Sequence, residues 1–326
     1  MDKMRPPTIS LIVFTYNQAD YIGDAILGAL SQTYSPIEII VSDDCSSDGT
    51  YETIKETIAG YNGPHKLILN RNEENLGLIG HINKVFGMAS GDIVVISSGD
   101  DISLPHRTQK LVDLYVANGG GPILFHGDVI KIDQNGNKVG LLKAGWGKAE
   151  INLEETALRD ALYIGASAAL TRELLNKFPP ISYKKAYEDL VWGFRAALLD
   201  AVIYVEEPLI MYRVEVGLSW ELKKNAEDSF LNAIEKDKRK LAVLKDVYRQ
   251  RMMDLEHADK HLMFKSLHLR LEEKHFEAKV DLEILQGKTI SLLRFLCRPR
   301  TLLQRIKSIR KYKRRLLKNQ IKAFHN

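Results

Sequence analysis

The chain has 326 residues, of which 45% are hydrophobic and 27% are charged. This composition is typical of one or two globular domains and excludes a chain that is disordered or collagen-like throughout. The uninterrupted apolar runs are far shorter than the ~20 residues that a membrane-spanning helix needs. The two cysteines, Cys45 and Cys297, are far apart in the sequence, so we expect no disulfide framework and a reducing, cytoplasmic location.

Basic residues are concentrated near the C-terminal end. Residues 298–326 contain 11 Lys and Arg and no Asp or Glu, which leaves 35 basic and 42 acidic residues in the remainder. Apolar residues recur there at helical spacing, at Leu302, Ile306, Ile309, Tyr312 and Leu316. A basic amphipathic helix of this kind is typical of a segment that lies on an anionic membrane surface. The alternative is a helix packed on the protein itself, and nucleic-acid binding is not expected because no aromatic interleaving accompanies the charge.

The first hundred residues alternate between strand-like and helix-like stretches. The predicted strands, in chain order, are residues 9–14, 37–41, 66–69 and 93–96. The predicted helices between them are residues 21–30, 50–58 and 78–89. This alternation predicts an α/β fold with a mainly parallel sheet that is flanked by helices.

The middle of the chain is mixed, and the last third is helical. Strands are predicted at residues 123–125, 129–132, 202–205 and 209–212, a hairpin turn at 133–136, and helices at 171–178 and 188–199. Residues 218–286 contain no Gly or Pro and have apolar positions at helical spacing, which predicts two or three packed helices. We therefore expect an α/β domain over residues 1–219 and a helical region over residues 220–326.

Polar residues follow all four strands of the first part. They are Thr15, Tyr16 and Asn17, then Asp43 and Asp44, then Arg71 and Asn72, and finally Ser98, Gly99, Asp100 and Asp101. A single Asp after a strand is usually a turn former, but ligands of open α/β sheets bind where the carboxyl ends of several strands meet. Oxygen donors without a His or Cys cluster favour Mg²⁺ or Mn²⁺, which commonly accompany a diphosphate. The glycine motifs of dinucleotide-binding and P-loop proteins are absent.

These motifs, in this order, resemble the donor half of the inverting family 2 glycosyltransferases, which have the GT-A fold. The resemblance includes Asn75-Leu-Gly77 and Asn83, and continues with Tyr187-Glu188-Asp189, which resembles the family's acceptor-side motif. Tyr212-Arg213-Val214 is similar to its closing strand. The resemblance covers residues 7–219 and implies a donor half over about 7–105 and an acceptor half over about 106–219.

The resemblance implies roles for the matching residues. Asp44, with Thr15 and Tyr16, would bind the nucleotide base, and Asp189 would be the catalytic base. Asp100 and Asp101 would bind the Mn²⁺ or Mg²⁺ that bridges the donor diphosphate. The other implied donor-site residues are Asn17, Asp43, Arg71, Asn75, Ser98 and Gly99. The acceptor-side or closing-strand candidates are Glu188, Trp192, Arg213 and Glu215.

Each of these motifs also has a simpler interpretation. Asp189 in the first turn of a helix would interact favourably with the helix dipole, by on the order of 0.3–1 kcal/mol, without any catalytic role.

Two residues depart from the family's motifs. Ser98 replaces the first Asp of the family's metal motif, and Glu215 replaces its closing His. Both replacements leave the metal stoichiometry open.

The leading hypothesis is an inverting, metal-dependent hexosyltransferase. It would move a sugar from a UDP- or dTDP-sugar to a hydroxyl of a glycan or lipid-linked acceptor, in cell-surface polysaccharide biosynthesis at the cytoplasmic membrane face. Residues 298–326 would bind the anionic membrane, and the C-terminal helices are a candidate homo-oligomer contact. Two alternatives stay open, namely a catalytically degenerate GT-A-like protein that binds nucleotide sugars or glycans, and an assembly scaffold that acts through its helical C-terminus.

Overall fold

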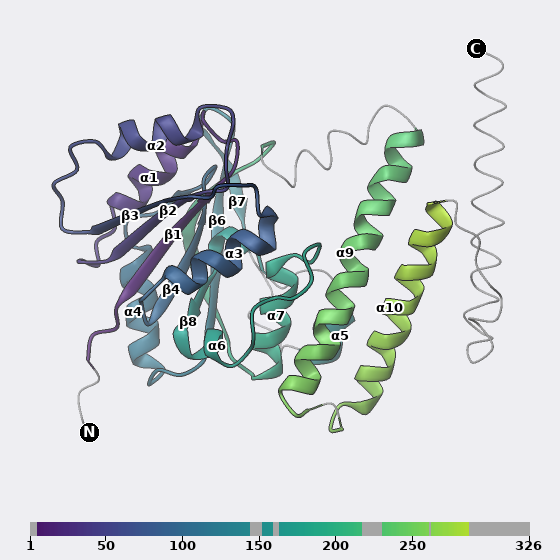
Figure 1. The fold of residues 1–326 in the computed structure, drawn as a ribbon. Coiled ribbons are helices and arrows are strands. Elements are labelled where there is room, and N and C mark those ends of the chain that lie inside the picture. Colours follow the sequence, from purple (N-terminus) through teal and green to yellow (C-terminus); the bar gives the residue numbers. More distant parts are fainter. Residues whose placement is uncertain (1–4, 144–151, 159–162, 217–229, 261, 287–326) are drawn as a thin grey trace, which may run out of the picture.

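A computed structural model describes residues 5–143, 152–158, 163–216, 230–260 and 262–286. Within these residues, nine strands form one sheet in the order β3-β2-β1-β4-β8-β6-β9-β5, with β7 paired to β6 (Figure 1). Their bounds are β1 (Ile9–Thr15), β2 (Glu38–Asp43), β3 (Lys66–Arg71), β4 (Ile93–Ser98), β5 (Ile102–Ser103), β6 (Leu124–Ile132), β7 (Lys138–Leu142), β8 (Ala169–Thr171) and β9 (Val202–Arg213).

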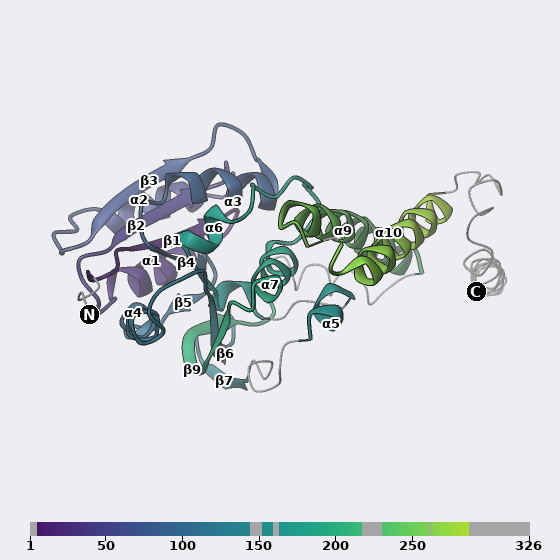
Figure 2. The same ribbon diagram turned by 90° about the horizontal axis from the view of Figure 1, so that it is seen from below.

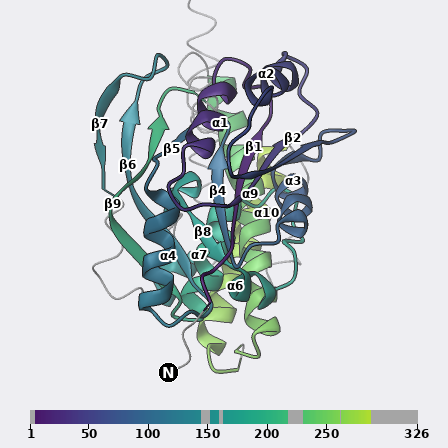
Figure 3. The same cartoon turned by 90° about the vertical axis from the view of Figure 1, so that its left-hand side faces the viewer.

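The first four strands of the chain are parallel, as the sequence predicts. β6 and β9 are also parallel to each other, whereas β5, β7 and β8 run antiparallel to their neighbours. In Figure 3, β6 and β7 lie at one side of the sheet, and β2 lies toward the other. β9 is one strand where the sequence predicted two, because Pro208 shifts the register opposite Asp128 without ending the strand.

Helices cover both faces of the sheet (Figure 2). One face carries α1 (Ile22–Leu30), α2 (Thr50–Ile58) and α4 (Arg107–Ala117), and the other carries α3 (Gly77–Met88), α6 (Arg172–Asn176) and α7 (Glu188–Leu198). Successive strand residues point to opposite faces, so Ile12 and Ile40 join one buried cluster while Leu11 and Ile39 join the other. Burial on both faces explains why the sequences of these strands are continuous apolar runs.

A helical hairpin packs outside these layers (Figure 1). It consists of α9 (Phe230–His257) and α10 (Lys265–Leu285), and it confirms the predicted C-terminal helical region. Tyr248 and Leu255 of α9 belong to the same buried cluster as residues of α3 and α7. The predicted boundary near residue 220 and the basic segment 298–326 lie outside the described residues. No helix in the described part of the chain combines the length and apolar character that a membrane span requires.

A buried ion pair joins α7 to α9. Arg195 donates from Nε to Asp254 Oδ2 at 3.0 Å and from Nη2 to Asp254 Oδ1 at 2.9 Å, and both side chains are 0% exposed. The guanidinium lies 4.5 Å from the centroid of the Trp192 ring. Desolvation offsets much of the attraction in such a pair, but removal of one partner leaves an uncompensated buried charge.

The substitution Asp254→Ala should therefore lower the free energy of unfolding by about 3–5 kcal/mol. Urea denaturation followed by circular dichroism measures this loss. The double substitution Arg195→Met with Asp254→Leu should recover most of the stability, because no buried charge then lacks a partner. Glu52→Ala, at an exposed glutamate of α2, is the control. A cost at Asp254 no larger than that of this control would contradict the interpretation.

Candidate active site

The carboxyl ends of β1 to β4 lie together at one edge of the sheet. Thr15, Asp43 and Arg71 are the last residues of β1, β2 and β3, and the register pairs Thr15 with Asp43 and Asp43 with Arg71. On the other side of β1, Phe14 pairs with Ser98, the last residue of β4. The polar motifs that follow these four strands therefore share one edge.

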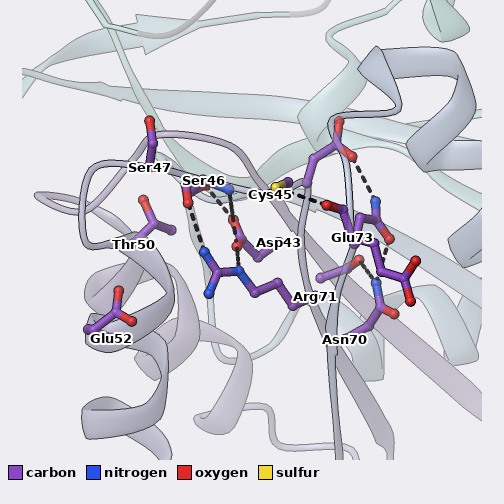
Figure 4. A network of polar contacts seen from close by, with 12 residues as sticks. Asp43, Cys45, Ser46, Ser47, Thr50, Glu52, Asn70, Arg71 and Glu73 are labelled. Carbon is purple, nitrogen blue, oxygen red and sulfur yellow. Dashed lines mark hydrogen bonds and ion pairs between the residues drawn. The ribbon is translucent and has the colours of Figure 1, made fainter.

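Asp43 and Arg71 bind each other beneath the loop that follows β2 (Figure 4). Arg71 Nε lies 3.3 Å from Asp43 Oδ2, and Arg71 Nη2 donates to the Ser46 carbonyl oxygen at 2.9 Å. The fully buried Asp43 carboxylate also accepts hydrogen bonds from the backbone N–H and the hydroxyl of Ser46. The Arg71 guanidinium lies 4.6 Å from the centroid of the Tyr51 ring. These contacts fix the shape of the loop after β2.

Asp44 holds the start of α3. Its Oδ1 accepts from Asn72 Nδ2 at 2.7 Å and from the Leu76 N–H at 2.9 Å, and its Oδ2 accepts from the Gly77 N–H at 3.0 Å. Asn75 Oδ1 accepts from the same Gly77 N–H at 2.8 Å. The negative charge of this carboxylate is stabilised by the positive end of the α3 dipole, which is at the N-terminus of the helix. A carboxylate has about four lone-pair directions, so these three hydrogen bonds leave one direction for another donor.

The turn after β1 packs tightly against the turn after β4. Thr15 Oγ1 donates to Gln18 Oε1 at 2.9 Å, and Asn17 turns the chain with a φ of 51°. A Cβ on Gly99 would lie 2.7 Å from Thr15 Oγ1 and 2.5 Å from Gln18 Oε1, so this approach requires glycine. Tyr16 is 48% exposed. Its ring is therefore accessible at the edge of the sheet.

Asp100 and Asp101 lie in a poorly hydrated position at the end of β4. The Arg213 N–H donates to Asp101 Oδ1 at 2.8 Å, and Arg213 Nε donates to the Asp100 carbonyl oxygen at 3.0 Å. Burial raises the pKa of Asp100, although a hydrogen bond from Gln18 and the charge of Arg213 oppose this shift. Burial and the charge of Asp100 together raise the pKa of Asp101 well above its usual value. A nearby cation would relieve the repulsion between these two carboxylates.

Arg213 joins two further segments to this turn. Its Nη2 donates to Asp24 Oδ2 of α1 at 3.0 Å, and its Nη1 donates to the Gln134 carbonyl oxygen in the β6–β7 turn at 2.8 Å. The guanidinium is 4.8 Å from the centroid of the Tyr21 ring, and the residue is only 2% exposed. Glu215, two residues further on, is exposed and has a φ of 65°. The buried Arg213 side chain therefore holds the turn at Asp100 in place by hydrogen bonding.

Glu188 and Asp189 begin α7, on the side of the sheet that carries α3. Asp189 Oδ1 accepts from the Leu190 N–H at 2.7 Å. A Cβ on Gly165 would lie 2.7 Å from Glu188 Oε1, so the 3₁₀ turn η2 (Gly165–Ser167) lies directly against Glu188. Burial and the charge of Asp189 raise the pKa of Glu188 to about 8. Glu188 is therefore largely protonated at neutral pH.

Arg107 connects this turn to the end of β4. Its Nη2 donates to the carbonyl oxygens of Ile96 at 2.8 Å and Ala166 at 3.0 Å, and Nη1 donates to Ser103 Oγ at 2.9 Å. Burial lowers the pKa of Arg107 to about 9, so the guanidinium remains charged at neutral pH. η2 thus contacts both β4 and the first residue of α7, Glu188.

Trp192 lies in the core and not at this edge. It is 3% exposed and belongs to the buried cluster between α3 and α7, with its ring centroid 6.3 Å from that of Phe86. This packing leaves no ring surface on which an acceptor sugar could stack.

No preformed metal cage is present among the described residues, since no three or more His, Cys, Asp or Glu side chains come together there. The end of β4 nevertheless fits a hard divalent ion, because it offers carboxylate oxygens as ligands. Burial disfavours the negative charge of Asp100 and Asp101, and a bound cation would compensate for it. A site of this kind would hold an ion by one or two carboxylates, with phosphate oxygens completing the shell.

Two solved structures have a fold similar to that of this chain. S. aureus TarS 1-349 in complex with UDP-GlcNAc has a TM-score of 0.53 and 16% sequence identity, over 87% of this chain and 93% of that one. Mannosyltransferase PcManGT from Pyrobaculum calidifontis, in complex with GDP-Man and Mn²⁺, has a TM-score of 0.51 and 18% identity, over 95% and 84%. At these identities the likeness shows the fold alone, which is the GT-A fold.

Sequence comparison shows the family. The profile described as "Glycosyl transferase family 2" matches residues 10–178, more than half of the chain, so the chain belongs to that family. An uncharacterized glycosyltransferase from Nostoc sp. is 29% identical over 212 residues, 63% of this chain and 64% of its own. The succinoglycan biosynthesis protein ExoO from Rhizobium meliloti is 31% identical over 127 residues, 39% of this chain and 35% of its own. The matches thus span less than two thirds of the length of either relative.

Several residues of this edge were not identified from the sequence. Gln18 contacts Thr15 and hydrogen-bonds the Asp100 carboxyl, and its position directly after the Thr15-Tyr16-Asn17 motif was a usable signal. Asn72, which the sequence did place at this edge, donates to Asp44. Arg107 carried no sequence signal, because its contacts join segments that are distant in the chain.

The raised pKa of Glu188 predicts a pH dependence of stability. From about pH 4.5, where an unfolded glutamate titrates, to about pH 8, the folded protein holds a proton that the unfolded chain does not, so the free energy of unfolding falls as pH rises. Glu188→Gln removes this titration and should make the decrease shallower when urea denaturation is measured between pH 5 and 8. Glu52→Gln should leave the slope unchanged. A Glu188→Gln slope equal to that of the wild type would contradict the shift.

Proposed function

We propose that this protein is an inverting hexosyltransferase that transfers a sugar from a nucleoside-diphosphate donor to an acceptor hydroxyl. The observation that carries the proposal is the meeting of Thr15, Asp43, Ser98 and their following residues at one edge of the sheet, in a chain that belongs to glycosyl transferase family 2. TarS and PcManGT, whose folds are similar, are complexed with UDP-GlcNAc and GDP-Man.

The donor nucleotide would lie across the ends of β1 and β2. The remaining lone pair of Asp44 suits a base N–H, and the exposed ring of Tyr16 suits stacking on the base, beside Thr15. Ser98 and Gly99 are at the end of β4, where the Ser98 hydroxyl suits a ribose hydroxyl and Gly99 allows the turn to approach Thr15 closely. Asn17, Asp43, Arg71 and Asn75 would act indirectly, because each of them takes part in the turns that form this surface.

A divalent ion would be held at the end of β4. Asp100, with Asp101 beside it, offers carboxylates to Mn²⁺ or Mg²⁺, and the diphosphate would supply the other ligands. Such an ion supplies charge stabilisation for the departing nucleoside diphosphate. Arg213 would fix the orientation of both residues through its bonds to Asp101 Oδ1 and to the Asp100 carbonyl oxygen.

Asp189 would remove the proton from the acceptor hydroxyl. A sugar hydroxyl is a weak nucleophile until a base takes its proton during attack, and a positioned base contributes typically 10²–10⁴-fold to the rate. Attack from the face opposite the leaving group inverts the anomeric centre. Glu188, protonated at neutral pH, would keep the pair from carrying two charges and could donate a hydrogen bond to the acceptor.

The acceptor would be a glycan or a lipid-linked sugar in cell-surface polysaccharide biosynthesis. The similarity to ExoO, a succinoglycan biosynthesis protein, supports this role. The 11 basic residues of segment 298–326, which lies outside the described residues, would hold the protein at the cytoplasmic face of an anionic membrane. The division into a domain over 1–219 and a helical region over 220–326, and self-association through the C-terminal helices, belong to the same proposal.

Asp189→Asn should lower kcat by about 10²–10⁴-fold, because the amide cannot accept the proton. The assay is the release of nucleoside diphosphate from a panel of UDP-, dTDP- and GDP-sugars, with nucleotide affinity measured by calorimetry. Glu188→Gln is the matched control and should stay within about tenfold of the wild type, because the wild-type residue is already protonated. Near wild-type release by Asp189→Asn with intact donor binding would show that Asp189 is not the base.

Asp100→Asn should remove the Mn²⁺-dependent part of donor binding. In the wild type, UDP with Mn²⁺ should raise the thermal midpoint more than UDP alone, because ligands that bind only the folded state stabilise it. The variant should show the same shift with and without Mn²⁺. Asp113→Asn, at an exposed residue of α4, should behave as the wild type does. A Mn²⁺-dependent shift that persists in Asp100→Asn would place the ion elsewhere.

A further inference from the structure

α9 contacts the loop that leads into α7. The Ser182 N–H donates to Gln250 Oε1 at 2.9 Å, and the Lys185 N–H lies 3.4 Å from Asp246 Oδ2. Gln250 is 0% exposed, and its Nε2 donates to Asp254 at 3.0 Å, so its amide orientation is fixed. One face of α9 thus holds the backbone just before Glu188 and Asp189.

Arg251, the next residue of α9, holds the backbone just after them. Its Nε and Nη2 donate to the Leu190 carbonyl oxygen at 3.2 and 2.8 Å, and its Nη1 donates to the Ala157 carbonyl oxygen of α5 (Leu153–Leu158) at 2.8 Å. The side chain is 1% exposed. Leu190 directly follows Asp189, so Arg251 fixes the peptide next to the proposed base. The planar fork of an arginine can bind two carbonyl groups in fixed directions, which a lysine cannot.

α3 holds the same loop from the opposite side. Asn83 Nδ2 donates to the Ile181 carbonyl oxygen at 2.8 Å, and the Ile181 N–H donates to Asn83 Oδ1 at 3.1 Å. The start of α3 is bound by Asp44, one of the proposed donor residues. The loop before α7 therefore lies between α3 on the donor side and α9 in the helical hairpin.

We infer that α9, through Arg251 and Gln250, positions Asp189 for proton transfer, so that the helical hairpin is part of the catalytic unit. The inference rests on the proposed function, in which Asp189 is the base. Proton transfer requires hydrogen-bond reach, and a displacement of about 1 Å can cost about 100-fold in rate. Arg251 touches no substrate in this scheme and acts on Asp189 through the backbone beside it.

The other end of α7 provides a matched control. Lys260, which follows α9, donates from Nζ to the Leu198 carbonyl oxygen in the last turn of α7 at 2.7 Å. Both cations thus bind an α7 carbonyl from the same hairpin, but only Arg251 does so next to Asp189. Simple loosening of the helix contact would make the two positions equivalent, whereas positioning of the base predicts an effect at Arg251 alone.

The test compares Arg251→Met, Arg251→Lys and Lys260→Met in the full-length chain, at a temperature well below each thermal midpoint. Arg251→Met should lower kcat for nucleoside diphosphate release by about 100-fold, with the donor KM within about threefold of the wild type. Arg251→Lys should recover part of the rate, and Lys260→Met should leave kcat unchanged. Amide hydrogen exchange followed by mass spectrometry should be faster over residues 182–192 in Arg251→Met only.

Equal loss of kcat in Arg251→Met and Lys260→Met would overturn the inference, because a general loosening would then explain both. Wild-type kcat and wild-type exchange over residues 182–192 in Arg251→Met would overturn it as well. Asp189→Asn, assayed in parallel, separates the two proposals. An inactive Asp189→Asn beside a fully active Arg251→Met rejects the inference alone, whereas an active Asp189→Asn rejects the assignment of the base and the inference with it.

Discussion

Parallel pairing of β1 with β2 and β4 fixes where the candidate site residues lie. Because the three strands are in register, Thr15, Asp43 and Ser98 end at nearly the same level, and the turns after them meet at one edge. Burial on both faces of the sheet holds this register, since a shift by one residue would move every side chain of a strand to the opposite face and disrupt its packing in both buried clusters. The proposed binding of donor and metal ion depends on this alignment.

Buried arginines connect the region around the strand ends to segments outside the parallel strands by hydrogen bonds. Arg107 binds the end of β4 to the turn against Glu188, Arg213 binds β9 to α1 and to the turn at Asp100, and Arg251 binds α9 to the first turn of α7. Each guanidinium has five donors in a rigid plane, so one side chain can bind carbonyl groups of several segments at once. The site is therefore supported by residues from the whole chain, including its helical hairpin.

The sequence predicted the parts of the fold that depend on local patterns. The apolar runs of β1, β2 and β4, the turn at residues 133–136 and the long C-terminal helices all follow from periodicity and turn residues, and the polar motifs after the strands identified one edge. The continuous strand through Pro208 and the contacts of Arg107 and Arg251 could not be predicted. They depend on which sequence-distant segments pack together, and local sequence patterns do not predict such contacts.

The most direct test of the central claim is a crystal structure of the protein soaked with UDP and Mn²⁺. We expect the uracil beside Asp44 and Tyr16, the ion bound to Asp100, and the diphosphate facing the first turn of α7. A nucleotide bound away from the ends of β1, β2 and β4, or an ion that Asp100 and Asp101 do not touch, would contradict it.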